Sequence, residues 1–231
     1  DYKEVPDPGF VHDLEGMADA ITPDTRLVFI ANPNNPTGTL VGQEEIDRFV
    51  DRLPDHVVAV FDEAYFEFLP DAPDAIKHVK AGKNVVVMRT FSKAQGLSAL
   101  RIGYGLAPAP IAGLLNRARQ PFNANAIAQA AALASMQDEE HIAATVENNR
   151  IGLEFFQSSF AKRGWEFVPS VANFVLVNVG DGDRVFAGLL KKGVIIRAMR
   201  GYRLPEWVRI SIGTPSQNER CLKELDALLV G

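Results

Sequence analysis

The sequence predicts an α/β fold in which a mostly parallel sheet with flanking helices is followed by a small C-terminal α/β domain. Two observations support this prediction. Four apolar runs rich in β-branched residues recur in the first half, and helical patterns or long connections separate most of them. Beyond Gly164 the runs become shorter, as in a small β/α lobe. We therefore expect a partial large domain at residues 1–145 and a long connecting helix with a small domain at residues 146–231.

The four runs of the first half are predicted to be strands of one sheet. They cover residues 26–31, 57–61, 85–89 and 102–106. Because these runs lack alternation between apolar and polar residues, we expect buried parallel strands. The connection from Arg89 to Ile102 is short for a parallel crossover, so the fourth strand could instead be antiparallel to its neighbour.

The remaining elements follow from helical periodicity and from short apolar runs. Helices are expected at residues 43–53, 124–136 and 139–163, and the third of these ends before Gly164, a typical C-terminal glycine. The small domain is predicted to contain strands at 174–179, 193–197 and 208–212 and helices at 183–192 and 216–230.

Composition and charge exclude several classes of protein. The 231 residues are 47% hydrophobic, which is enough for a sizeable core, and the net charge of -5 offers no basic surface for nucleic acid or membrane. No apolar stretch reaches the roughly 20 residues that span a bilayer. A single cysteine, Cys221, excludes an intrachain disulfide framework and fits the reducing cytoplasm, and the four histidines show no metal-ligand spacing. We expect a cytoplasmic protein without a metal site.

The N-terminal residues contain neither an initiator Met nor a signal-peptide pattern. They read as the middle of a polar connection. We therefore expect the chain to be a fragment of a longer protein.

The segment Asn-Pro-Asn-Asn-Pro-Thr-Gly, residues 32–38, directly follows the first predicted strand. Proline fixes φ, restricts the residue before it, and favours turns, so a simple turn would explain this composition. The alternative is a rigid support that holds the side chain of Asn35 at the end of the sheet.

Polar side chains also follow the next two predicted strands. Asp62 and Tyr65 come after the second strand, and Thr90, Ser92 and Lys93 come after the third. Since ligands of open α/β sheets bind outside the carboxyl ends of the strands, we expect these side chains to converge. Each also has a simpler interpretation: Asp62 as a helix N-cap and Lys93 as a solvated lysine.

Taken together, these residue types fit the chemistry of pyridoxal phosphate. A lysine amine forms a Schiff base with its aldehyde, and a carboxylate such as that of Asp62 keeps the pyridine nitrogen protonated. Asn35 and Tyr65 can hydrogen-bond the phenolic oxygen. Hydroxyl groups and a guanidinium suit the phosphate, and Thr90, Ser92 and Arg101 can supply them, although Arg101 could equally be a surface ion-pair partner.

Three segments in this order resemble the fold-type I pyridoxal phosphate aminotransferases, specifically the histidinol-phosphate aminotransferase branch. They are NPNNPTG at 32–38, FDEAYFEF at 61–68 and TFSKAQGLSALRIGYG at 90–105. WVRISIGT at 207–214 resembles that branch's segment with a substrate-binding arginine, and PSVANFVLV at 169–177 resembles the strand that opens its small domain.

The resemblance implies a role for each matched residue. Lys93 would be the Schiff-base lysine and proton shuttle, Arg209 would bind the substrate α-carboxylate, and Asn173 either assists there or is simply a polar residue at a strand end. The cofactor-binding residues would be Asn35, Asp62, Tyr65, Thr90, Ser92 and Arg101. The resemblance further implies a homodimer that transaminates a substrate such as histidinol phosphate with 2-oxoglutarate as acceptor.

The chain departs from the pattern of this branch at several positions. Gln95 stands where the branch has an aromatic residue, Ser98 and Ala99 stand where it has Ala-Gly, and Arg203 replaces a usual glycine. Members of the branch also carry about a third more chain at the N-terminus. The alternatives left open are an aromatic aminotransferase, a threonine-phosphate decarboxylase and an inactive truncated fragment.

Overall fold

A computed structural model describes residues 1–229, and the chain divides into two compact units. The first comprises Asp1–Asn34 and Leu40–Ile142, and the second comprises Asn35–Thr39 and the chain from Ala143 onward. The predicted boundary lies after residue 145, close to the division after Ile142. The main difference is that Asn35–Thr39 belong to the second unit.

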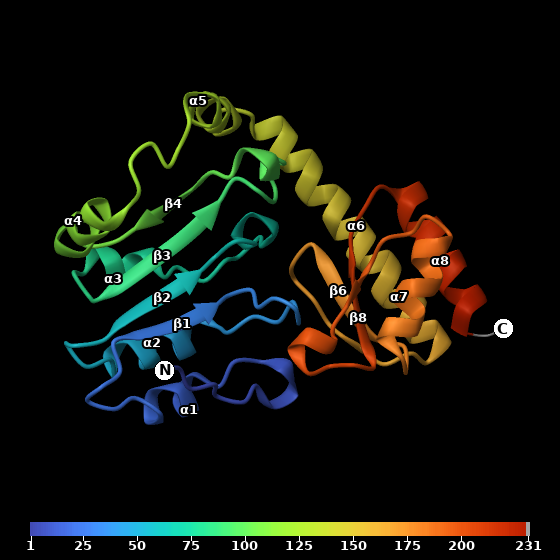
Figure 1. Ribbon diagram of the computed structural model, residues 1–231, viewed down its shortest axis with the longest axis horizontal. Coiled ribbons are helices and arrows are strands. Elements are labelled where there is room, and N and C mark those ends of the chain that lie inside the picture. Colours follow the sequence, from blue (N-terminus) through green and yellow to red (C-terminus); the bar gives the residue numbers. More distant parts are fainter. Residues whose placement is uncertain (230–231) are drawn as a thin grey trace. The chain divides into compact units, whose positions relative to one another are not determined.

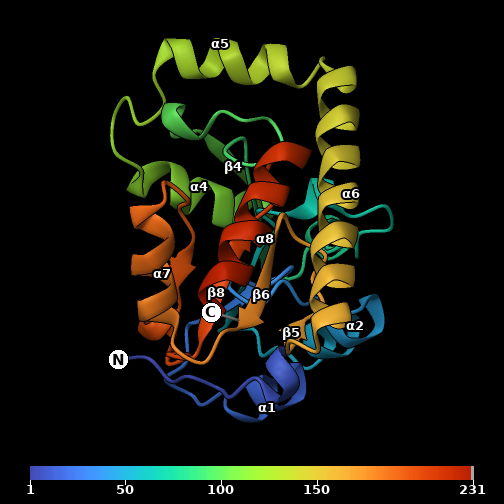
Figure 2. The same ribbon diagram turned by 90° about the vertical axis from the view of Figure 1, so that its right-hand side faces the viewer.

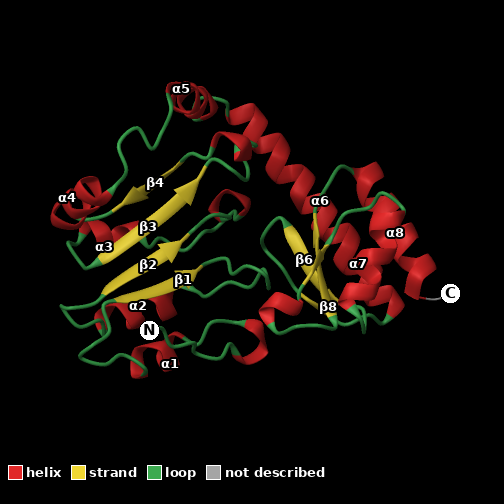
Figure 3. Ribbon diagram, viewed as in Figure 1, coloured by secondary structure: helices red, strands yellow, loops and turns green. Residues whose placement is uncertain are grey.

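The first unit is built on a four-stranded sheet (Figures 1 and 3). The strands lie in the order β1 (Leu27–Ala31), β2 (Val58–Asp62), β3 (Val85–Thr90) and β4 (Gly103–Leu106). The first three are parallel, and β4 runs antiparallel to β3. This confirms both the mostly parallel sheet and the antiparallel orientation suggested by the short connection before the fourth strand.

Helices of the first unit cover one face of this sheet. Ile46 and Phe49 of α2 pack with Ile30 and Phe61 of the strands in one buried cluster. The sequence predicts that the strands are buried on both faces, and for β1 this is wrong. On its other face, Leu27 and Phe29 are 53% and 63% exposed. The helices are α1 (Leu14–Asp19), α2 (Gln43–Asp51), α3 (Ile76–Lys80), α4 (Ala109–Ala118) and α5 (Ala126–Ser135), of which α1, α3 and α4 were not predicted.

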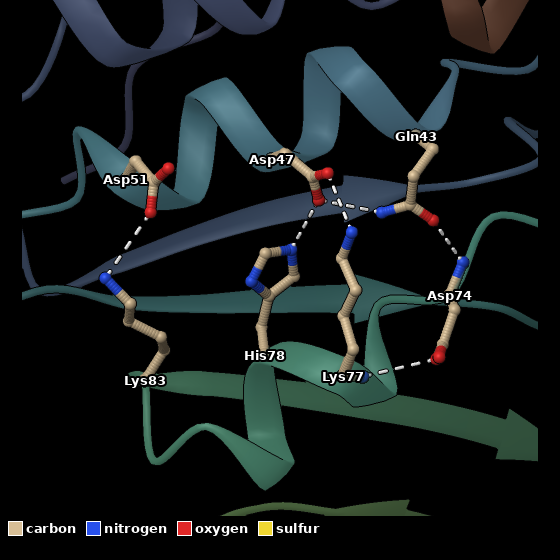
Figure 4. A network of polar contacts seen from close by, with 7 residues as sticks. All are labelled: Gln43, Asp47, Asp51, Asp74, Lys77, His78 and Lys83. Atoms are coloured by element: carbon tan, nitrogen blue, oxygen red, sulfur yellow. Dashed lines mark hydrogen bonds and ion pairs between the residues drawn. The ribbon is translucent and has the colours of Figure 1, made fainter.

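A polar network joins α2 to α3 (Figure 4). The carboxylate of Asp47 accepts hydrogen bonds from Lys77 Nζ at 2.7 Å and Gln43 Nε2 at 2.8 Å, and it lies 2.9 Å from His78 Nε2. The hydrogen bond from Lys77 is the main cause that lowers the pKa of Asp47 to about 2. These contacts hold the two helices together beneath the sheet.

The second unit contains an antiparallel sheet with helices on one face (Figure 2). The strands lie in the order β5 (Phe167–Val168), β6 (Phe174–Asn178), β8 (Trp207–Ser211) and β7 (Arg197–Ala198). Val175 and Val208 pack with Phe156, Leu189 and Leu225 of the helices. These helices are α6 (Glu139–Arg163), which begins in the first unit, α7 (Gly182–Lys191) and α8 (Pro215–Leu229).

Two predicted elements of this unit differ from the structure or reach beyond it. The prediction of a strand at residues 193–197 was wrong except for its last residue. Gly193 has a φ of 71° and completes the end of α7, where Val194 N donates to Leu189 O at 3.0 Å. Residue 230, the end of the last predicted helix, lies outside the described residues.

Cys221 lies on α8 and is buried in the core of the second unit. Burial raises the pKa of its thiol to about 11. Across residues 1–229, no helix is both long enough and apolar enough to cross a lipid bilayer.

Candidate active site

The carboxyl ends of the parallel strands bring Asp62 into register with its neighbours. Asp62 lies opposite Ala31 of β1 and Met88 of β3 in the sheet. One of its carboxylate oxygens accepts a hydrogen bond from Ala64 N at 3.1 Å, which fixes the side chain in a turn. The short 3₁₀ helix that follows has Tyr65 as its N-cap, so Asp62 is not the helix N-cap of the simpler interpretation.

Lys93 follows β3 and is half-buried, unlike a typical solvated lysine. Its Nζ lies 5.2 Å from the centre of the Tyr65 ring, and Tyr65 is itself only 6% exposed. A cation over an aromatic face is attracted by the negative potential of the ring. The structure therefore brings together two of the predicted site residues, one from the loop after β2 and one from the loop after β3.

Ser92 and Arg101 form a second pair in the first unit. Arg101 Nη1 lies 3.4 Å from Ser92 Oγ and donates to Ser98 O at 2.8 Å, and the guanidinium is exposed. Thr90 behaves differently, because its hydroxyl accepts from Ser92 N at 3.1 Å and so stabilises the loop. Ser92 and Arg101 thus present a hydroxyl and a guanidinium, whereas the Thr90 hydroxyl is already used locally.

This set of groups in the first unit fits pyridoxal phosphate. The ammonium of Lys93 lies beside an aromatic ring, and the carboxylate of Asp62 is oriented at a strand end of the same sheet. The guanidinium of Arg101 provides forked charged donors for a phosphate, and the hydroxyl of Ser92 adds a neutral donor. These three kinds of group match an aldehyde, a pyridine nitrogen and a phosphate ester.

The loop after β1 is held in a defined shape. The side chain of Asn32 pairs with the backbone of Val41 in both directions, at 2.8 and 3.1 Å, and so closes the base of the loop. At its far end Gly38 has a φ of 76°, and a Cβ there would overlap the side chain of Ser170. The loop is therefore more than a flexible turn.

In the second unit this loop brings Asn35 to Arg209. Arg209 Nη1 donates to Asn35 Oδ1, and the guanidinium carbon lies 4.8 Å from the centre of the Phe174 ring. Arg209 Nε is buried without a hydrogen-bond partner among the described residues. Two more predicted site residues are thus in direct contact, and the arginine keeps a buried donor that an anion could use.

Sequence analysis missed Arg197, which lies directly opposite Arg209 in the β7–β8 ladder. Directly opposed residues of an antiparallel pair place their side chains on the same face of the sheet. Only the register reveals this pair, because an isolated arginine at the end of a predicted strand gives no signal. Asn173 lies just before β6, where its backbone oxygen accepts from Ile212 N at 2.9 Å, so the structure shows the strand-end position expected in its simpler interpretation.

A buried ion pair beside Asp62 was also not foreseen. Glu63 is 5% exposed, and Arg89 contacts its Oε2 through Nε at 2.9 Å and Nη2 at 2.8 Å. The Arg89 guanidinium also lies 3.5 Å from the centre of the Phe66 ring. Burial raises the pKa of Glu63 even though Arg89 opposes this shift. This pair ties the loop after β2 to β3.

Comparisons with known proteins show which family the chain resembles. Residues 2–225 match the family model described as aminotransferase class I and II. The chain is 55% identical over 229 residues to a histidinol-phosphate aminotransferase of Akkermansia muciniphila, covering 99% of this chain and 63% of that protein. It is 50% identical over 232 residues to histidinol-phosphate aminotransferase 2 of Ralstonia nicotianae, covering 98% of this chain and 62% of that protein.

A solved structure shows the same fold. The histidinol-phosphate aminotransferase of Sinorhizobium meliloti, in complex with pyridoxal-5'-phosphate, has a TM-score of 0.87 and 30% identity, and the match covers 94% of this chain and 61% of that one. The chain thus spans less than two thirds of the length of these relatives. By its match to the family model over nearly all of its length, this chain belongs to the aminotransferase class I and II family.

Proposed function

We propose that this chain carries the cofactor-binding and substrate-binding parts of a pyridoxal phosphate-dependent histidinol-phosphate aminotransferase, with 2-oxoglutarate as the amino-group acceptor. Family membership and the names of its relatives support a transaminase. We further propose that it works as a homodimer in the cytoplasm, as part of histidine biosynthesis.

The first unit would hold the cofactor through Lys93 at the aldehyde, Asp62 at the pyridine nitrogen, and Ser92 and Arg101 at the phosphate. Tyr65 would donate to the phenolic oxygen, and Asn35 would do so through its amide nitrogen, because its amide oxygen already accepts from Arg209. Thr90 would support the phosphate site through its contact with Ser92. When bound, the cofactor would supply an electron sink for the carbanion formed at the substrate Cα.

Lys93 Nζ would take the proton from the substrate Cα and return it during transfer of the amino group. The aromatic ring of Tyr65 beneath this nitrogen limits where the amine can move. In the second unit, Arg209 would bind the anionic group of the substrate, which is the phosphate of histidinol phosphate or a carboxylate of 2-oxoglutarate. Asn173 would assist there.

The observation that carries the choice of substrate is the opposition of Arg197 and Arg209. Like charges directly opposite each other in a sheet destabilise it unless an anion lies between them. A phosphate dianion can satisfy two guanidinium groups, whereas an aromatic amino acid offers only one carboxylate charge. This favours a phosphate-bearing amino substrate.

Cofactor binding is tested by adding pyridoxal phosphate and reducing the product with borohydride. We expect visible absorbance that disappears on reduction, and a mass increase located on Lys93. Lys93→Ala should lose both signals and all turnover, while Lys83→Ala, at an exposed ion pair with Asp51, should keep them. Retained transaminase activity in Lys93→Ala, or no absorbance in the parent chain, contradicts the proposal; the second result identifies an inactive fragment.

The substrate is tested by product analysis with histidinol phosphate, phenylalanine and threonine phosphate. We expect a keto product from histidinol phosphate, and a rise in its KM of about tenfold in Arg197→Ala, since one charged hydrogen bond is lost. The KM for phenylalanine should change less. Preference for phenylalanine, or release of carbon dioxide from threonine phosphate, would assign the chain to one of the alternative activities.

A further inference from the structure

Two half-buried polar side chains, Glu67 and Gln95, connect the loops that carry Tyr65 and Lys93. Gln95 Nε2 donates to Glu67 Oε1 at 3.0 Å. The remaining oxygens of the pair, Glu67 Oε2 and Gln95 Oε1, are buried without a hydrogen-bond partner among residues 1–229. A buried acceptor without a donor is costly, so this contact calls for an explanation beyond packing.

The two residues occupy equivalent positions in their loops. Lys93 begins a tight turn closed by a hydrogen bond from Gly96 N to Lys93 O at 3.0 Å, and Gln95 is the third residue of that turn. Tyr65 begins a turn closed by Phe68 N donating to Tyr65 O at 3.2 Å, and Glu67 is its third residue. Each turn thus carries a chemically important residue first and an anchoring residue third.

The contact between the anchoring residues therefore bears on the distance between the first residues. Lys93 Nζ lies 5.2 Å from the centre of the Tyr65 ring, across the same two loops. The Glu63–Arg89 ion pair joins the beginning of the first loop to β3, but it lies before both Tyr65 and Lys93 in the chain. The Glu67–Gln95 contact joins the two loops beyond both residues.

Stability alone does not account for this pair. Replacing both partners of a buried hydrogen bond by apolar groups of similar size is nearly neutral or stabilising, because no unpaired polar atom then remains. A polar pair that leaves two buried acceptors without donors among the described residues contributes little to folding but fixes the relative position of two loops. This is the property expected of a contact that serves the site.

We propose that Glu67 and Gln95 are positioning residues, whose hydrogen bond holds the Lys93 amine against the Tyr65 ring. This rests on the proposed function in that Lys93 is the reactive amine. The role requires a hydrogen bond between the two side chains and does not require the negative charge of Glu67.

The test measures acylation of Lys93 by acetic anhydride in the full chain without cofactor, read by mass spectrometry of peptides. Glutamine at position 67 still presents an oxygen to Gln95, whereas leucine at position 95 cannot donate. In Gln95→Leu we therefore expect Lys93 to react about threefold faster or more, the factor expected for the loss of one hydrogen bond. In Glu67→Gln we expect the parent rate, and exposed Lys83 should be unchanged in every variant.

A double variant, Glu67→Leu with Gln95→Leu, removes the contact without leaving a lone buried carboxylate. We expect fast labelling of Lys93 together with an unchanged or higher melting temperature. The double variant therefore tests the proposal even if Gln95→Leu does not fold. Parent-like labelling in the double variant overturns the proposal, and so does equally fast labelling in Glu67→Gln, which would indicate an effect of charge. Because no cofactor is present, these results do not depend on whether borohydride traps pyridoxal phosphate on Lys93.

Discussion

The two units hold their candidate functional groups by different means. In the first, the candidate groups lie on loops after parallel strands, and contacts between buried side chains tie these loops together. In the second, Arg209 lies within β8, and the ladders to β6 and β7 fix the direction of its side chain. Loss of one polar contact in the first unit should therefore displace the candidate side chains. In the second unit, loss of one polar contact should change the charge around Arg209 but leave its side chain in position.

The largest effect is expected when the buried ion pair of the first unit is broken. Arg89→Leu leaves the carboxylate of Glu63 buried without its cation and should lower the free energy of unfolding by about 3–5 kcal/mol at pH 7. Denaturation by urea measures this loss. Glu63→Gln should cost less, because its amide oxygen still accepts from Arg89.

The effect of Arg89→Leu should also depend on pH. Burial raises the pKa of Glu63, so the folded state binds a proton more readily than the unfolded state. Stability from this group is present below the unfolded pKa and is lost as pH rises through the folded pKa. Arg89→Leu, which has no cation to oppose the shift, should therefore recover stability on acidification; equal loss at pH 7 and pH 5 would contradict this account.

An intermediate effect is expected at Gly38, in the loop segment of the second unit. Gly38 and Gly82 both have a φ of 76°, but only at Gly38 would a Cβ overlap another side chain, that of Ser170. Gly82→Ala, in the first unit, should cost about 1–2 kcal/mol through its backbone conformation alone. Gly38→Ala should cost about 1–3 kcal/mol more because of the overlap.

Urea denaturation of Gly38→Ala and Gly82→Ala separates the cost of the backbone conformation from the cost of the overlap with Ser170. Adding Ser170→Gly to Gly38→Ala should recover part of the extra loss, since it removes the overlapped atoms. If the two single variants are equally destabilised, the loop segment is not held against Ser170 as the structure indicates.

The smallest effect is expected at Asp47, on the face of α2 that meets α3. Its pKa is lowered to about 2, chiefly by the hydrogen bond from Lys77, and its side chain is 35% exposed. Stability from a lowered pKa is present above the unfolded value, near 3.8, and is lost as pH falls through the folded value. Asp47→Asn should cost about 1 kcal/mol at pH 7, allowing for solvent screening, and nothing near pH 2. Thermal melts over this range test it, and a constant difference would show that charge is not involved.

The sequence was sufficient to predict the parallel sheet, its antiparallel fourth strand and the long α6 helix, because uninterrupted apolar runs and helical periodicity are local signals. It also led us to predict Lys93, Asp62 and Asn35 as site residues from their positions after strands, and their roles stay predictions. It could not reveal the pairing of Arg197 with Arg209 or of Glu67 with Gln95, since both depend on register or on contacts between loops. The strand expected at 193–197 failed because Gly193 completes a helix end.

The structure also bears on two of the departures from the family pattern, Arg203 and Gln95. Arg203 has a φ of 61°, a conformation that glycine adopts without strain, which explains why a glycine is usual there. Gln95, in place of an aromatic residue, makes the polar contact to Glu67. At Arg203 the backbone conformation, and at Gln95 a side-chain contact, thus bear on the departure from the branch, whereas nothing in the structure explains Ser98 and Ala99.

Cys221 offers a built-in reporter of the opening of the second unit. With its thiol pKa raised to about 11 in the folded core, only about one molecule in 10⁴ carries the reactive thiolate at pH 7, against a few per cent in an unfolded chain. The rate of alkylation of the Cys221 thiol therefore reports how often α8 separates from its sheet. Such a measurement would follow transient opening of the arginine-bearing unit without introducing a new residue.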